Sequence, residues 1–376
     1  MAIGSVIGAI SLSELQQYAP DQKIINPDRT LEYGNLQGSL ELRERIAAMY
    51  SSPESGVTLS AENVIITPGS TQANYLVLSA LAGPGDHIIC QYPTYSQLFL
   101  VPKYQGAEIS LWKLKRGPNG WEAGLDELKA MIKPNTKAII INNPNNPTGA
   151  VLSSSILSSL VSLAARHPSL TLISDEVFRP LFHFPTPPPP SLLSLNHPRS
   201  AVTSSMSKAY GLPGIRIGWV ASPDLAFLKR ISMARLYTTL SVSQLDQAVA
   251  AVALIPSVTE KIMEKNLAIC RRSIEIIGEF VERNRERVEW IPPQGAGVAI
   301  VRFKERDGGY VDDVRFAAAL VERTGVGVVP VEYAFGEPEG GDEEFKGVMR
   351  IALGVEEGVL RGALGEVEGF LEGGEW

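Results

Sequence analysis

SMSKAYGLPGIRIG, residues Ser205–Gly218, places a single lysine among small residues just after the apolar run Ala201–Thr203. A lysine held partly desolvated has a lowered pKa, and its uncharged amine can form a Schiff base with a carbonyl group. The Ser205 hydroxyl and the Arg216 guanidinium suit the binding of a phosphate dianion. These residues alone leave two interpretations open, a reactive Lys208 beside a phosphate site or a surface lysine in a Gly-rich turn.

The same segment resembles the cofactor-lysine signature of class I/II aminotransferases, S-x-[ST]-K-x-x-G-L-x-G-x-R-[IV]-G, at all fourteen positions. Members of that family bind pyridoxal 5′-phosphate (PLP) through a Schiff base with this lysine. The resemblance implies that Lys208 carries PLP and that Ser205 and Arg216 bind its phosphate. Weaker likeness extends in the same order from about Tyr33 to Leu353, which is most of the chain.

Short apolar runs alternate with helical stretches through the middle of the chain. Strands buried on both faces and separated by helices favour a largely parallel sheet, which binds ligands at the carboxyl ends of its strands. The predicted strands are 64–67, 87–90, 137–141, 170–173 and 201–203. The resemblance implies an α/β protein of PLP-dependent transferase fold type I, with a mostly parallel seven-stranded sheet in the large domain and a smaller α+β domain.

The pattern from Leu245 to Asn284 predicts one long helix that leads from the large domain into the smaller one. Strands are expected after it at 298–303, 326–331 and 348–353. On this interpretation residues 38–262 form the large PLP-binding domain, and residues 1–37 and 263–376 form the small domain.

Two polar motifs follow predicted strands. Asn142–Gly149, NNPNNPTG, resembles the family's N-P-x-N-P-T-G loop, and the likeness assigns Asn146 to the pyridine O3′ and to the substrate. Asp175–Phe178, DEVF, resembles D-E-V-Y, and Asp175 would pair with the pyridine nitrogen. A buried carboxylate there raises the pKa of that nitrogen, so the protonated ring withdraws electrons from the substrate. Alone, the first motif is only a turn and Asp175 only a helix N-cap.

The remaining site residues also rest on the resemblance. Pro68–Ala73 opens a helix, whose N–H groups suit a phosphate, and the likeness places Ser70, Thr71 and Gln72 there. Tyr95 would stack on the cofactor as part of the catalytic site with Lys208 and Asp175. The implied further contacts are Tyr33, to the phosphate of the neighbouring subunit, and Arg350, to the substrate carboxylate. The Tyr33 contact implies a homodimer with shared active sites.

Phe178 departs from the family pattern, which has a tyrosine that donates to O3′ at this position. Without that donor, O3′ keeps more negative charge. We therefore expect the Lys208 Schiff base to stay protonated to higher pH than in a typical member of the family.

Composition excludes several other classes of protein. A formal charge of −7 argues against nucleic acid or an anionic membrane as the main partner. Two cysteines and four scattered histidines give no metal motif, and the low cysteine count fits a reducing compartment. No run of apolar residues is long enough to span a membrane, and the N-terminus lacks the basic region of a signal peptide. We expect a cytoplasmic protein.

The leading hypothesis is a PLP-dependent aminotransferase that moves an amino group between an α-amino acid and an α-keto acid through a Lys208 Schiff base. The alternative is a PLP enzyme of the same fold that performs elimination, cyclisation or oxidation of an amino acid, because a fold does not specify a reaction. A third interpretation, a ligand sensor fused to a DNA-binding module, lacks both a basic patch and a preceding helix-turn-helix segment.

Overall fold

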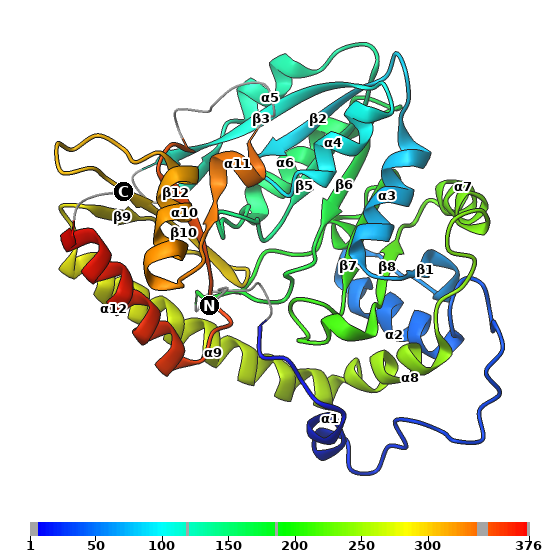
Figure 1. Cartoon of the computed structure of the whole chain (residues 1–376). Coiled ribbons are helices and arrows are strands. Elements are labelled where there is room, and N and C mark those ends of the chain that lie inside the picture. The colour runs from blue at the N-terminus through cyan, green and yellow to red at the C-terminus, as the bar shows by residue number, and fades with distance from the viewer. Residues whose placement is uncertain (1–6, 118–119, 185–186, 337–344, 374–376) are drawn as a thin grey trace.

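The computed structural model describes residues 7–117, 120–184, 187–336 and 345–373. A large sheet lies on one side of the molecule and a small sheet on the other (Figure 1). The large sheet has the strand order β1 (Val64–Thr67), β8 (Gly218–Ala221), β7 (Ser200–Ser205), β6 (Thr171–Asp175), β5 (Thr136–Asn142), β2 (His87–Tyr92), β3 (Glu108–Gly117) and β4 (Gly120–Ala123). Strands β7, β6, β5, β2 and β3 are mutually parallel, whereas β8 and β4 run the opposite way.

The expected α/β fold is confirmed, and the large sheet has eight strands where seven are predicted. The additional strand β4 forms an antiparallel hairpin with β3 at the edge of the sheet. Strand β3 carries Glu108, Lys113 and Lys115 and is only partly buried. Continuous apolar runs indicate strands that are buried on both faces. The charged residues of β3 interrupt any such run, so the sequence did not indicate this strand.

Alternate residues of the central strands pack into two separate cores, as expected for a strand covered on both sides. In β5, Ile139 and Ile141 face one core, and Ala138 and Ile140 face the other. The first core also takes side chains of α2 (Leu40–Tyr50), α5 (Leu125–Met131), α6 (Ser154–Ala165) and α8 (Gln244–Ala253). The second takes those of α3 (Ser70–Leu81), α4 (Gln97–Tyr104) and α7 (Leu225–Leu236).

The register of the parallel strands aligns three polar residues at their carboxyl ends. Asn142 of β5 pairs with Asp175 of β6, and Asp175 pairs with Thr203 of β7. All three side chains are almost completely buried. The sheet therefore presents a polar end, and the functional loops begin there.

The single long helix expected from Leu245 to Asn284 is wrong. The chain forms α8 and then α9 (Pro256–Arg283), with a break at Leu254 and Ile255. Pro256 lacks an N–H group and its ring clashes with the preceding turn, so it begins a new helix instead of continuing the first. The expected domain division remains a proposal, in which the boundary after residue 262 lies inside α9.

The small sheet is antiparallel, in the order β11 (Val329–Pro330), β12 (Val348–Ala352), β10 (Val298–Phe303) and β9 (Val288–Trp290). Helices α9, α10 (Asp313–Thr324) and α12 (Glu357–Gly373) pack beside it, and α1 (Leu12–Tyr18) contacts α9 (Figure 1). The predicted strand 298–303 is confirmed, and 348–353 is confirmed to within one residue.

The predicted strand 326–331 is largely wrong, because only Val329 and Pro330 are extended. The next residues form the short helix α11 (Val331–Phe335). The carboxylate of Asp313 accepts a hydrogen bond from the Glu332 backbone N–H at 2.9 Å and so caps this helix. Within the described ranges, every helix is too short or too polar to cross a bilayer.

Candidate active site

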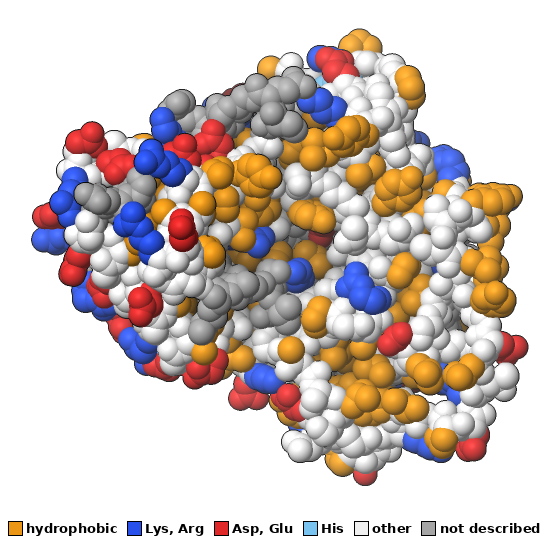
Figure 2. All heavy atoms as spheres, in the orientation of Figure 1, with side chains coloured by type: hydrophobic (Ala, Val, Ile, Leu, Met, Phe, Trp, Pro, Cys, Tyr) orange, Lys and Arg blue, Asp and Glu red, His pale blue; other side chains and the backbone are white. Residues whose placement is uncertain are grey.

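A cavity of about 480 Å³ lies at the carboxyl ends of the parallel strands, between the large and small sheets. The surface is hollowed there, and Lys and Arg side chains are visible in the hollow (Figure 2). Its wall includes most of the residues singled out in the sequence, namely Ser70, Thr71, Tyr95, Asn146, Asp175, Phe178, Lys208, Arg216 and Arg350. Loops far apart in the sequence thus meet at one site, as the strand-end rule for open α/β sheets requires.

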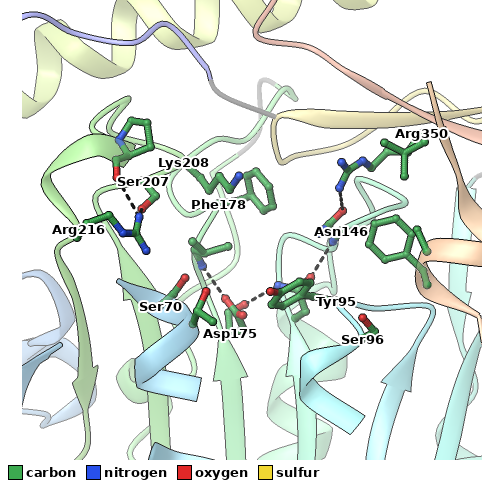
Figure 3. Close-up of a pocket in the computed structure, with 17 residues that line it drawn as sticks. Ser70, Tyr95, Ser96, Asn146, Asp175, Phe178, Ser207, Lys208, Arg216 and Arg350 are labelled. Atoms are coloured by element: carbon green, nitrogen blue, oxygen red, sulfur yellow. Dashed lines mark hydrogen bonds between the residues drawn. The ribbon is translucent and has the colours of Figure 1, made fainter. Parts of the chain in front are cut away.

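Lys208 follows β7 and lies near the middle of this cavity (Figure 3). Burial lowers the pKa of its amine to about 8, and the positive charges of Arg350 and Arg216 act in the same direction. The loop that carries it is fixed by two backbone contacts, because Gly211 O accepts from Ile10 N at 3.0 Å and Ala209 O accepts from Asn266 Nδ2 at 2.8 Å. Lys208 is therefore a positioned amine, a substantial fraction of which is uncharged near neutral pH.

Asp175 ends β6 and forms the floor of the cavity. Its Oδ2 accepts from Asn74 Nδ2 at 2.9 Å, and its Oδ1 accepts from Val177 N at 3.1 Å. Burial raises the pKa of this carboxyl to about 6, although both hydrogen bonds favour the ionised form. A buried carboxylate in this position suits a cationic partner such as a protonated pyridine nitrogen.

One end of the cavity is built for an anion. Helix α3 begins at Ser70, its N-cap Gly69 has no side chain to occupy the first N–H groups, and Ser70 and Thr71 line the cavity. Arg216 reaches the same end (Figure 3), where its Nη1 donates to Ser207 Oγ at 3.3 Å and to Pro213 O at 2.9 Å. A side chain at Gly69 would collide with this guanidinium, since a Cβ there would lie 2.3 Å from Nη2. Helix dipole and guanidinium together favour a phosphate.

The opposite end is formed by Arg350 of β12 (Figure 3). Its Nη1 donates to Asn146 Oδ1 at 3.1 Å, and its guanidinium carbon lies 5.2 Å from the centroid of the Phe335 ring. The hydrogen bond and the cation–π contact hold the planar guanidinium in one orientation. Such a group can bind a carboxylate through two parallel hydrogen bonds.

Three of the predicted site residues do not line the cavity. Gln72 turns away, and its Nε2 lies 3.4 Å from Thr238 Oγ1. Ser205 is completely buried, and its Oγ accepts from Ser207 N at 3.2 Å. Tyr33 is 69% exposed on the segment before α2. The expected roles of these three residues remain proposals.

Sequence reasoning missed several residues of the wall. Ser207 lies directly before Lys208 in the signature and contacts Arg216, so its place in the motif is a usable signal. Val329 of β11 and Ala334 and Phe335 of α11 also line the cavity. These three are ordinary apolar residues in the sequence, and the pairing of β11 with β12 and the packing of α11 against β12 bring them to the site.

Residues 13–366 match the family described as Aminotransferase class I and II. The chain belongs to this family. Arginine–pyruvate transaminase AruH of Pseudomonas aeruginosa is 30% identical over 321 residues, which cover 82% of this chain and 76% of that enzyme. Capreomycidine synthase of Streptomyces vinaceus is 32% identical over 267 residues, which cover 71% of this chain and 66% of that enzyme.

Solved structures agree with this assignment. A PLP-dependent aminotransferase from Streptococcus suis superposes with a TM-score of 0.86 at 32% identity and covers 100% of this chain and 94% of that one. The chain is a PLP-dependent aminotransferase of fold type I. The residues present fit that cofactor, because the cavity combines an anion site, a buried carboxylate, an aromatic ring and a lysine of lowered pKa.

Burial of Asp175 predicts a pH-dependent loss of stability in the PLP-free protein. Its folded pKa of about 6 lies above the ordinary value of 3.8. The folded state therefore binds the extra proton, and the associated stability is present below pH 4 and is lost as the pH rises through 6. The difference in unfolding free energy between the native protein and the Asp175→Asn variant should fall by about 2 kcal/mol between pH 4 and pH 7. Denaturant titrations at both pH values measure it, and a pH-independent difference contradicts the prediction.

Phe178 is buried and lines the cavity, so the expectation drawn from its missing hydroxyl can be tested at this position. The Phe178→Tyr variant adds a donor that can stabilise a phenolate oxygen. We expect the pH midpoint of the visible absorption band of the PLP-loaded protein to be lower in Phe178→Tyr than in the native protein. Identical midpoints would show that residue 178 does not reach that oxygen.

Proposed function

We propose that this aminotransferase transfers an amino group between an α-amino acid and an α-keto acid, with Lys208 as both the cofactor lysine and the acid–base group. The observation that carries this proposal is the position of Lys208, which shares one cavity with the buried Asp175 carboxylate and with Arg350. Burial lowers the pKa of its amine to about 8, and the charges of Arg350 and Arg216 act in the same direction.

The residues assigned to hold PLP form two groups, one at its phosphate and one around its ring. Ser70, Thr71, Ser207 and Arg216 bind the phosphate, with Ser205 acting through the backbone of Ser207. The ring lies among Asp175, Tyr95, Phe178 and Asn146, with Asp175 at its nitrogen and Tyr95 against its face. Gln72 remains assigned to the phosphate end of the site, because it lies in the first turn of α3. When bound, PLP supplies the electron sink that stabilises negative charge at the α-carbon.

The substrate is oriented by its α-carboxylate. Arg350 binds that carboxylate, and Asn146 accepts a hydrogen bond from the Arg350 guanidinium and so fixes its position beside the substrate. Fixing the substrate at this end places its α-hydrogen toward Lys208, whose amine removes the proton and later returns it. Positioned general acid–base catalysis of this kind contributes about 10²–10⁴-fold to a rate.

Amino-acid addition to the PLP-loaded protein tests the proposal. The visible band should bleach while a keto acid forms, and a different keto acid should restore the band. In Lys208→Ala, PLP should still bind through its phosphate, but borohydride should no longer fix the cofactor mass to the peptide that carries residue 208. Release of ammonia or a cyclised product, without restoration of the band, would instead support elimination or cyclisation.

We also propose a homodimer with shared active sites. Large apolar side chains are exposed before α2 and at the end of α7, namely Leu31 at 74%, Tyr33 at 69% and Tyr237 at 86%. Hydrophobic side chains also gather over α7 in the space-filling view (Figure 2). Gln244 Nε2 donates to Glu32 O at 2.7 Å and fixes the segment that carries Tyr33, which would reach the partner's phosphate site.

The dimer proposal predicts a mass in solution of about twice the chain's 40.7 kDa. Light scattering of the purified protein measures it, and a monomer at micromolar concentration contradicts the proposal.

We further propose a cytoplasmic location, which the two free, buried cysteines Cys90 and Cys270 support. Cell fractionation tests that location.

A further inference from the structure

Asn74 is a polar residue in the interior of α3, and it is almost completely buried. Its Nδ2 donates to Asp175 Oδ2 at 2.9 Å, and its Oδ1 accepts from Thr203 Oγ1 at 2.5 Å. We propose that Asn74, oriented by Thr203, is a positioning residue that holds the Asp175 carboxylate ionised and aimed at the cofactor ring nitrogen. This inference rests on the proposed role of Asp175 at that nitrogen.

Thr203 determines which end of the amide faces the carboxylate. An asparagine side chain has one donor end and one acceptor end. The Thr203 hydroxyl donates to Oδ1, so the amide can present only its N–H group to Asp175. Strand register makes this possible, because Thr203 lies beside Asp175 on the neighbouring strand.

Both carboxylate oxygens of Asp175 then receive donors, Oδ2 from Asn74 and Oδ1 from Val177 N. A protonated Asp175 would need an acceptor for its own hydrogen, and neither of these contacts offers one. The pair of donors fixes the plane of the carboxylate and favours its ionised form. Each oxygen still has a lone pair for a further N–H donor.

The other groups near Asp175 do not stabilise its ionised carboxylate as Asn74 does. Burial raises the Asp175 pKa most, and the neighbouring Glu176 acts in the same direction. The Glu176 carboxylate is itself paired with Arg179 at 3.1 Å. Of the cations that line the same cavity, Arg216 and Arg350 lie at its two ends and Lys208 lies between them (Figure 3). Asn142 of β5 contacts the Asp175 backbone oxygen instead of its carboxylate. Asn74 is thus the side chain whose hydrogen bond lowers this pKa.

The position in the helix supports a functional reason for the residue. Asparagine is a poor helix former, and burial of an amide is unfavourable unless it is hydrogen-bonded. The neighbouring Ala73, Leu76, Val77 and Leu78 are the apolar core residues expected on this face. An asparagine among them costs stability that a leucine would not.

Carbon-13 NMR of the full-length, PLP-free chain labelled at aspartate tests the proposal, with Asp175→Asn used to assign the signal. In Asn74→Leu the Asp175 pKa should rise by about one unit or more, because a hydrogen bond to a charged group is lost. The same variant should bind PLP about 10-fold more weakly, since the ring nitrogen meets a neutral acid over more of the pH range.

Two further variants separate orientation from packing. Thr203→Val keeps the side-chain shape and should raise the Asp175 pKa in the same direction by a smaller amount. Gln105→Leu is a matched control, because it removes another amide contact to α3, that of Gln105 Nε2 with Ser79 Oγ at 2.6 Å, away from the site. The Asp175 pKa should be unchanged in this control.

An unchanged Asp175 pKa in Asn74→Leu overturns the inference, as does a rise of equal size in Gln105→Leu. If Asn74→Leu does not fold, the Thr203→Val titration decides, and no shift there overturns it. A failure of the proposed role of Asp175 is distinguished from these outcomes, because PLP affinity would then be the same in Asp175→Asn and in the native chain while the NMR shifts persist.

Discussion

A carboxylate buried at the end of a central strand is the constraint on which the rest of the site depends. Asp175 lies at the carboxyl end of β6, where its side chain is almost completely buried at the floor of the cavity. An ionised group in such a place is unfavourable unless hydrogen bonds and a cationic partner compensate for its lost hydration. The hydrogen bonds come from Asn74 of α3 and from the Val177 backbone N–H, which donate to the two carboxylate oxygens. Thr203, beside Asp175 in the register, orients Asn74.

The two ends of the cavity come from different parts of the chain. The start of α3 and Arg216, beside the large sheet, form the anion site, whereas Arg350 of β12 and the apolar wall of α11 come from the side of the small sheet. The hydrogen bond from Arg350 to Asn146 joins the two parts across the cavity. Any relative movement of the two parts would therefore alter the distance between Arg350 and Lys208, and with it the alignment that the proposed proton transfer requires.

Several sequence-based expectations failed for identifiable physical reasons. Strand β3 was missed because its exposed edge carries charged residues, and the long helix after Leu245 was overextended because Pro256 begins a second helix. A strand is expected over 326–331, but the chain enters helix α11 at Val331, and the Asp313 carboxylate caps that helix. Pro256 and the Asp313 contact thus outweighed the local pattern, whereas β3 lacks the apolar run on which the strand prediction depends.

The sequence by itself determined the family, because the fourteen positions from Ser205 to Gly218 match the family's signature throughout. The proposal that Lys208 is the cofactor lysine follows from the same segment, and the other strand-end motifs were found because local turns need particular residues. Only the tertiary structure decided that Gln72 and Ser205 turn from the cavity, that Phe335 and Ser207 line it, and that Asn74 contacts Asp175. The contact between Asn74 and Asp175 joins residues 101 positions apart, and its geometry follows from how helix α3 packs on the sheet, which no local pattern encodes.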